Sequence, residues 1–230
     1  SYSEKYLATV YSYILNEAHR TSPIPWDPCS DDLDVTYDRE DYNSYQINLG
    51  NWSASSDYYE FWSHFYRGIR SATYFIQHIG DNQEMLNDPT RGPLVVEQYK
   101  NEARFLRAYY YSLLMSTFGP VFILGDEPTD YEQEDLNERE RDSWEKCVDY
   151  VTTELYEASK GLPQEWASAK YGRATKGAAL AIRSRVYLYS ARKLFNGNDL
   201  YKGVIDKYGN PLFPTAVSYT HLTLPTKRIV

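Results

Sequence analysis

The densest group of ionisable side chains in the chain is a run of carboxylates in its N-terminal quarter. The run comprises Asp31, Asp32, Asp34, Asp38, Glu40 and Asp41. Several oxygen ligands on one flexible loop suit calcium, and two carboxylates facing each other across a glycosidic bond could hydrolyse it. The Asp-x-Asp-x-Asp-Gly pattern with a trailing Glu is absent, and a solvated acidic loop is the simpler alternative. Calcium is therefore left open, without a motif that supports it.

Aromatic and amide side chains on the same stretch are the best candidates for contact with a ligand. They are Trp26, Tyr42, Tyr45, Asn48, Asn51 and Trp52. Trp and Tyr rings stack on the C–H faces of sugars, while amide groups form hydrogen bonds with sugar hydroxyls. The alternative is that the two tryptophans pin a long loop to the helices. We predict these six side chains as ligand-binding residues.

Motifs for other chemistry are missing from the sequence. No His-Glu-x-x-His, Cys-x-x-Cys, Gly-x-Ser-x-Gly or phosphate-binding glycine loop occurs, so we expect no metal site, no catalytic residue and no cofactor. A net charge of −8 argues against nucleic acid as a partner. Cys29 and Cys147 are expected to be free thiols.

Arg104 and Arg107 invite a second functional interpretation, as contacts to an anionic ligand. They lie three residues apart and so share one face of a helix. We expect a structural role instead, in which the stems pack and the guanidinium groups meet loop carbonyls or an acid such as Glu102.

The elements that must position these residues are helices. Apolar residues recur at spacings of three and four along five stretches, around residues 7–18, 57–79, 96–118, 142–160 and 174–195. Asp57 with Glu60, and Asp142 with Glu145, are expected to cap the second and fourth helices. Residues 21–56 predict a long loop, and Val121–Leu124 is the only plausible extended segment. The pattern predicts an all-α fold of antiparallel helix pairs.

Two long segments resemble a known family. They are Glu102–Leu124, EARFLRAYYYSLLMSTFGPVFIL, and Gly172–Asn198, GRATKGAALAIRSRVYLYSARKLFNGN. Both resemble helical signatures of the SusD/RagB family, the nutrient-binding outer-membrane lipoproteins of Bacteroidetes, and they occur in the expected order. The resemblance implies tetratricopeptide-like antiparallel helix pairs with long loops.

The resemblance also implies a function without catalysis. A SusD-like protein captures an oligosaccharide, or less often a peptide, and passes it to a TonB-dependent SusC-like transporter. Such a protein is a surface-exposed lipoprotein of the cell outer membrane, held by a lipid anchor whose cysteine would lie upstream of Ser1. No single ligand-binding residue can be carried over from the family.

The resemblance covers residues 1–217, which we expect to be the N-terminal part of a SusD-like domain. Residues 218–230 break the pattern and resemble a translated sequencing adapter, so we expect an artefactual tail.

Two rival functions remain at this stage. One is an all-α glycoside hydrolase, in which Asp31, Asp32 or Asp34 would be catalytic. The other is a helical-repeat scaffold that binds protein partners. Neither rival accounts for the two signature segments together.

Overall fold

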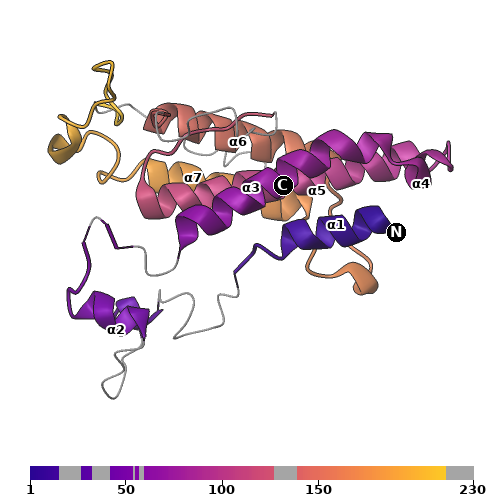
Figure 1. Ribbon diagram of the computed structural model, residues 1–230, viewed down its shortest axis with the longest axis horizontal. Helices are drawn as coiled ribbons and strands as arrows, with labels where there is room; N and C mark the ends of the chain where they lie inside the picture. The colour runs from indigo at the N-terminus through magenta and orange to yellow at the C-terminus, as the bar shows by residue number, and fades with distance from the viewer. Residues whose placement is uncertain (16–26, 33–41, 54, 57–59, 127–138, 216–230) are drawn as a thin grey trace.

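The all-α class predicted from the sequence is confirmed. The structure is a computed structural model that describes residues 1–15, 27–32, 42–53, 55–56, 60–126 and 139–215. Its helices are α1 (Tyr2–Tyr11), α2 (Asn43–Asn48), α3 (Phe61–His78), α4 (Gln83–Leu86), α5 (Gly92–Phe118), α6 (Trp144–Gly161) and α7 (Lys176–Ser190) (Figure 1). Short 3-10 turns are η1 (Asp27–Cys29), η2 (Ile79–Asp81), η3 (Ser168–Lys170) and η4 (Asp199–Tyr201). Across these ranges no β-strand forms, and one isolated bridge joins Ile205 to Pro211.

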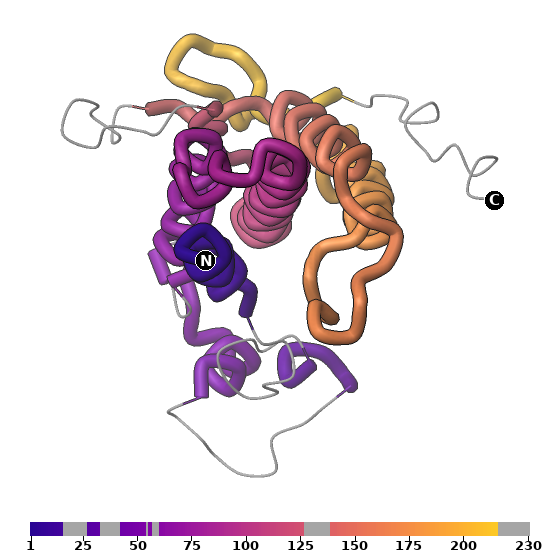
Figure 2. Tube along the Cα trace, turned by 90° about the vertical axis from the view of Figure 1, so that its right-hand side faces the viewer, coloured from indigo at the N-terminus to yellow at the C-terminus, as the bar shows by residue number. Residues whose placement is uncertain are grey.

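Helix α5 is the centre of the molecule. It packs on α3 at one side and on α6 at the other, and α7 packs against α6. Figures 1 and 2 show α3, α5, α6 and α7 running side by side with alternating direction, while α1 lies against α3 and α5. Consecutive long helices thus form the antiparallel pairs that the sequence predicts.

The sequence of α5 explains why it is long and buried. Pro93 stands in its first turn, where a missing N–H costs nothing. Leu106, Tyr110 and Leu114 recur at spacings of four and are fully buried. The helix ends as predicted, because Gly119 takes the positive φ of 73° and Pro120 cannot continue a helical turn.

Both predicted helix caps are wrong. Helix α3 begins after Glu60, which makes no side-chain cap, and Asp57 lies outside the described residues. Ser143 rather than Asp142 caps α6, and its hydroxyl accepts a hydrogen bond from Lys146 N at 3.3 Å. The Asp142 carboxylate instead accepts one from Ile123 N at 2.7 Å. The Asp142 carboxylate is therefore bound by a backbone N–H from a distant segment, and it does not cap α6 as the local sequence pattern predicts.

Other element boundaries also differ from the prediction. Helix α1 ends at Tyr11, and the predicted Ile14 is exposed while Ala18 lies outside the described residues. Helix α2 lies within the stretch predicted as a loop, and it is too short to show an apolar period. Residues 121–124 are extended without a ladder, because Ile123 N and Leu124 N donate to the side chains of Asp142 and Tyr111.

The cysteines are free, as expected. Cys147 is buried, and its thiol donates to Val121 O at 3.2 Å. Burial disfavours the thiolate and raises the pKa of Cys147 to about 12. Cys29 is half-buried beside η1.

Close approach of α3 to α5 requires a glycine. A Cβ on Gly68 would lie 3.0 Å from the ring of Tyr110 and 3.1 Å from Cβ of Tyr13. Tyr110 is itself fully buried, and its hydroxyl donates to Val10 O at 2.5 Å. The ring is therefore held in place and has little room to yield.

We expect Gly68→Val to lower the free energy of unfolding by about 2 kcal/mol, because overpacking forces this interface apart. Urea denaturation measures the change. Gly177→Val in α7 is the matched control, because its nearest outside atom, Thr175 Oγ1, is 3.9 Å from the built Cβ. Equal effects of the two variants would show that Gly68 is not a packing constraint.

Candidate functional site

The predicted ligand-binding residues that the structure describes lie on a segment that stands apart from the helix bundle. Figure 1 shows α2 and its flanks away from the long helices. Tyr42 precedes α2 in an extended conformation, and Tyr45 lies on it; both are half-buried. Trp52 follows the turn at Gly50, where φ is 75°, and 63% of its surface is exposed. Trp26 lies outside the described residues.

The two asparagines of this set hold the segment together. Asn48 Nδ2 donates to Pro28 O at 2.6 Å and so joins α2 to η1. Asn51 Nδ2 donates to Gln46 Oε1 at 2.9 Å. The ring of Trp52 is exposed and does not pack on the helices. The hydrogen bonds of the two asparagine amides, and not the Trp52 ring, therefore hold this loop. The open indole face is therefore the part of this set best placed to meet a ligand.

The acidic cluster is only partly described. Asp31 and Asp32 are exposed next to η1, and the backbone N of Asp32 donates to Ser30 Oγ at 3.2 Å. Asp34, Asp38, Glu40 and Asp41 lie outside the described residues. Among the residues that are described, no three His, Cys, Asp or Glu side chains are grouped to hold a metal ion.

Arg104 and Arg107 have the structural role expected of them, but with a different acid. Both bind Glu154 of α6: Arg104 Nη2 lies 2.6 Å from its Oε1, and Arg107 Nη2 lies 2.8 Å from its Oε2. Arg107 also reaches Asp126 at 2.6 Å and Thr73 at 3.3 Å. The Arg107 side chain is buried and is not available to an anionic ligand, while Arg104 uses its Nε and Nη2 on Glu154.

Glu102 pairs with Arg173 instead. The Arg173 guanidinium donates two hydrogen bonds to the Glu102 carboxylate, at 2.8 and 2.5 Å, and Glu102 is fully buried. Tyr11 of α1 donates to the same carboxylate at 2.7 Å. Arg173 also lies over the ring of Trp166, 4.5 Å from its centroid. This cluster joins the two signature segments, which sequence spacing alone could not show.

Burial and charge act in opposite directions on Glu154. Desolvation by burial raises the pKa of this carboxyl, but hydrogen bonds from Arg104 and Arg107 outweigh it, and the pKa lies below its ordinary value of 4.5. Glu154 is therefore charged at neutral pH and balances two cations inside the α5–α6 interface.

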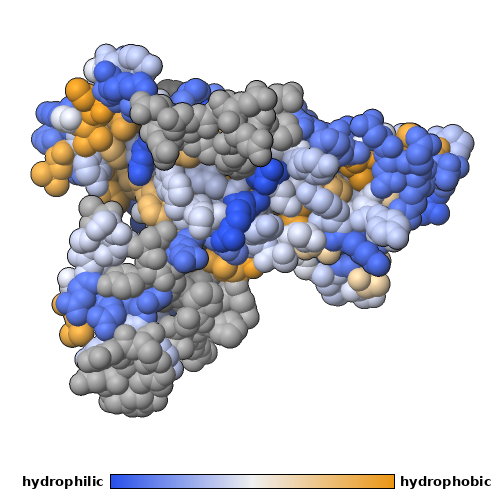
Figure 3. All heavy atoms as spheres, in the orientation of Figure 1, coloured by the Kyte–Doolittle hydropathy of each residue, from blue (hydrophilic) through white to orange (hydrophobic). Residues whose placement is uncertain are grey.

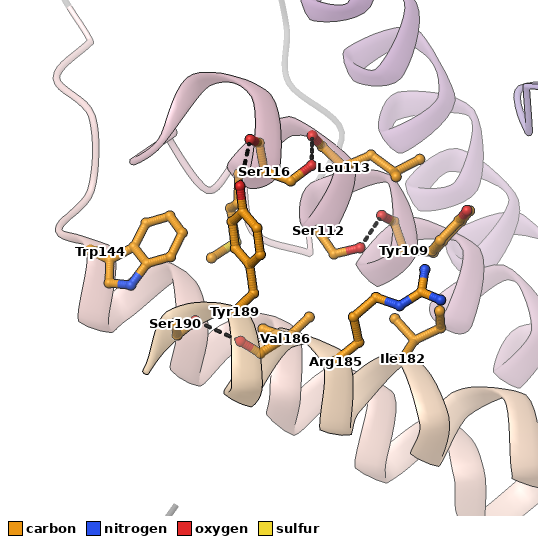
Figure 4. A pocket seen from close by; sticks show the side chains of 11 residues that line it. Tyr109, Ser112, Leu113, Ser116, Trp144, Ile182, Arg185, Val186, Tyr189 and Ser190 are labelled. Atoms are coloured by element: carbon orange, nitrogen blue, oxygen red, sulfur yellow. Dashed lines mark hydrogen bonds between the residues drawn. The ribbon is translucent and has the colours of Figure 1, made fainter. Parts of the chain in front are cut away.

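A cavity of about 250 Å³ opens between α5 and α7. Figure 4 shows Arg185 extending from α7 toward Tyr109 of α5. The hydroxyls of Ser112 and Ser116 donate to carbonyls of their own helix, and Tyr189 donates to Ser116 O. The serine and Tyr189 hydroxyls are therefore used within the fold, but the guanidinium of Arg185 also lines the cavity, and Trp144 Nε1 is buried there without a hydrogen-bond partner among the described residues. A mostly apolar lining with these two donors suits a largely apolar ligand that carries an acceptor.

Large apolar side chains are exposed on the segment after α7. They are Leu194, Leu200, Val204, Ile205 and Tyr208. Figure 3 shows apolar atoms gathered at the corner where this segment projects in Figure 1. An exposed apolar group of this kind is typical of a contact surface.

No helix among the described residues is long and apolar enough to cross a membrane.

A sequence model of a SusD-like family, described as starch-binding and associating with the outer membrane, matches residues 3–188. A search of curated proteins finds no match. Among solved structures, a SusD-like protein from Bacteroides fragilis is 27% identical with a TM-score of 0.64, over 84% of this chain and 35% of its own. A SusD-like carbohydrate-binding protein from the same species is 22% identical with a TM-score of 0.63, over 82% of this chain and 37% of its own.

A SusD homolog from Bacteroides thetaiotaomicron is 19% identical with a TM-score of 0.63, over 88% of this chain and 37% of its own. The last two likenesses show the fold alone. This chain spans little more than a third of the length of each of these three structures.

The Glu154 cluster predicts a stability that depends on pH. We expect Glu154→Gln to lower the free energy of unfolding by about 3 kcal/mol at pH 7, because it leaves two guanidinium groups without their shared acid. The pKa of Glu154 is lower in the folded state than in the unfolded chain. Its contribution is therefore complete above about 4.5 and is lost as pH falls through the folded pKa.

Urea denaturation from pH 7 to acidic pH measures this contribution, and the difference between the native chain and Glu154→Gln should shrink below about 4.5. Asp199→Asn is the control, because its pair with Lys202 at 2.7 Å is exposed to solvent on both sides and away from the Glu154 cluster, where an ion pair contributes little. A difference that stays constant with pH would contradict the role given to Glu154.

Proposed function

Because the chain belongs to the SusD-like family, described as starch-binding and associating with the outer membrane, we propose that it captures an oligosaccharide outside the cell. It then passes that ligand to a TonB-dependent SusC-like transporter. Binding and release are the whole mechanism, without covalent chemistry. The protein acts as a lipoprotein on the surface of the outer membrane, and some members of its class would take a peptide.

The exposed ring of Trp52 is the observation that carries this proposal. An indole with most of its surface in water contributes little to the fold, yet it offers a flat apolar face for a pyranose ring. Tyr42 and Tyr45 add aromatic surface nearby. Asn48 and Asn51 each donate an amide N–H within this segment, and we include them in the proposed site as further polar contacts. We include Trp26 in the same site on the basis of its sequence position.

The arrangement favours binding over hydrolysis. Asp31 and Asp32 are exposed neighbours on one short segment, and Asp34 lies outside the described residues, whereas a glycosidase holds two carboxylates on opposite sides of the scissile bond. The glycoside hydrolase rival therefore has no supporting observation in the described part of the chain.

Binding to a protein partner has one observation in its favour, the exposed apolar side chains at 194–208. A transporter or another protein could cover them. Capture of oligosaccharide and contact with a partner protein are compatible, because the apolar corner and α2 lie on different segments.

We expect Trp52→Ala to weaken the binding of maltoheptaose about tenfold, since a stacked aromatic is worth about 1 kcal/mol beyond its buried area. Isothermal titration with the full chain measures the dissociation constant. Thermal unfolding should not change, because the ring is exposed.

Tyr171→Ala is the matched control, because Tyr171 is 77% exposed on the segment before α7. An unchanged affinity after Trp52→Ala would place the glycan site elsewhere. The transporter step is tested by co-purification of the lipidated protein with an outer-membrane barrel, and absence of any barrel would refute it.

A further inference from the structure

A second group of exposed aromatic rings lies far from α2. Tyr2 and Tyr6 are one turn apart on α1, and Tyr74 and His78 are one turn apart near the end of α3. Together with Asn82 they border a hollow of about 170 Å³. Figure 1 shows the start of α1 and the end of α3 at the opposite end of the molecule from α2. We call these five residues the aromatic shelf.

The rings of the shelf form a nearly parallel series. The centroids of His78 and Tyr74 are 4.0 Å apart, and those of Tyr74 and Tyr6 are 6.0 Å apart. Tyr6 in turn stacks on the buried ring of Phe75 at 5.6 Å. Interplanar angles of 19–26° keep these rings in similar orientation. The shelf is therefore supported from the core while its outer surface is open.

The tyrosine hydroxyls of the shelf differ from those of most tyrosines packed between helices. Several tyrosines packed between helices use their hydroxyls: Tyr11 donates to Glu102, Tyr66 to Phe122 O and Tyr110 to Val10 O, although the buried hydroxyl of Tyr150 has no partner among the residues that the structure describes. Within the described part of the chain, the hydroxyls of Tyr2, Tyr6 and Tyr74 have no hydrogen-bond partner, and these side chains are 83%, 37% and 46% exposed. Three phenols are thus available to donate and accept.

In its neutral form, His78 adds one hydrogen-bond acceptor to the shelf, its Nε2 atom. Its Nδ1 lies 2.8 Å from Tyr74 O, and a carbonyl can only accept, so Nδ1 carries the proton in the neutral ring. Nε2 is then left with a lone pair at the exposed end of the ring. Asn82 is fixed by Ser3 and by the backbone of Glu84, which holds this edge of the shelf in place.

We propose that the aromatic shelf is a second carbohydrate-binding surface, which takes a pyranose ring of a neutral oligosaccharide. The proposal rests on the proposed function for its class of ligand, but not on the site at α2. Flat rings meet the C–H face of the sugar, and phenol hydroxyls with His78 Nε2 meet its hydroxyls. The hollow holds about one sugar ring.

The charges around the shelf and the size of the hollow favour a neutral sugar over an anionic membrane surface or a peptide helix. Lys5 is close to the ring of Tyr2, 5.8 Å from its centroid, and Glu84 accepts from Tyr2 N. Lys100 Nζ lies 3.6 Å from the Cβ position of Gly80, and Asp81 stands in η2 beside Asn82. This mixture of cations and acids is not the basic cluster that an anionic membrane surface attracts. The hollow is also too small for the row of apolar anchors through which a peptide helix binds.

Labelled rings in the full chain test the shelf and the α2 site separately. Tyrosine and tryptophan carrying ¹³C in their rings are followed by NMR while maltoheptaose, xylohexaose or mannohexaose is added. Tyr74→Phe identifies the Tyr74 signal, and Trp52→Ala identifies that of Trp52. We expect the Tyr74 signal to shift with at least one oligosaccharide, and to shift equally in the Trp52→Ala chain.

Matched variants give the affinity change. We expect Tyr74→Ala, in the Trp52→Ala background, to weaken the remaining binding about threefold to tenfold. Tyr156→Ala on α6 should leave it unchanged, although Tyr156 is 44% exposed and Tyr74 is 46% exposed. Tyr74→Phe keeps the ring and removes the hydroxyl, so its loss should be smaller than that of Tyr74→Ala.

The outcomes are distinct. If Trp52 responds and Tyr74 does not, the shelf proposal is overturned while the proposed function stands. If Tyr74 responds and Trp52 does not, the shelf is supported and the α2 site fails. If neither responds to any of the three sugars, both fail. A Tyr74 signal that shifts only with a tryptic casein digest would make the shelf a peptide site and overturn the proposal.

Discussion

Two buried carboxylates, Glu102 of α5 and Glu154 of α6, are the charges on which the remaining structure depends. Glu102 is neutralised by Arg173 and also bound by Tyr11 of α1, so one side chain joins the first helix, the central helix and the entry to α7. Glu154 is neutralised by Arg104 and Arg107 from the facing helix. Burying an isolated charge is so unfavourable that these elements must assemble together or not at all.

This core arrangement determines where a ligand can bind. Three arginines of the signature segments are committed to internal acids, so the long helices offer no cluster of free cations from these positions. The cavity between α5 and α7 is mostly apolar, with its serine hydroxyls turned to their own helix. In the proposed function, carbohydrate contact therefore falls to exposed aromatic rings beside α2 and at one end of the bundle, where stacking needs no buried charge.

The two aromatic regions differ in how they are supported. Trp52 sits on a short segment held by side-chain amides, apart from the bundle. The shelf of Tyr6 and Tyr74 sits directly on the packed helices α1 and α3, over Phe75. A long oligosaccharide that reaches both would gain from effective concentration without new contacts at either.

The sequence by itself determined the all-α class, the long helices, the stop at Gly119-Pro120 and the two signature segments, because apolar period and helix-stopping residues act locally. It also placed Arg104 and Arg107 in a structural role. Only the tertiary structure decided their partner, since Glu154 is distant in sequence and reaches them through the α5–α6 interface. The missed helix α2 and the aromatic shelf have the same cause. A six-residue helix has too few residues to show a period, and Tyr6 and Tyr74 become one surface only when α1 folds against α3.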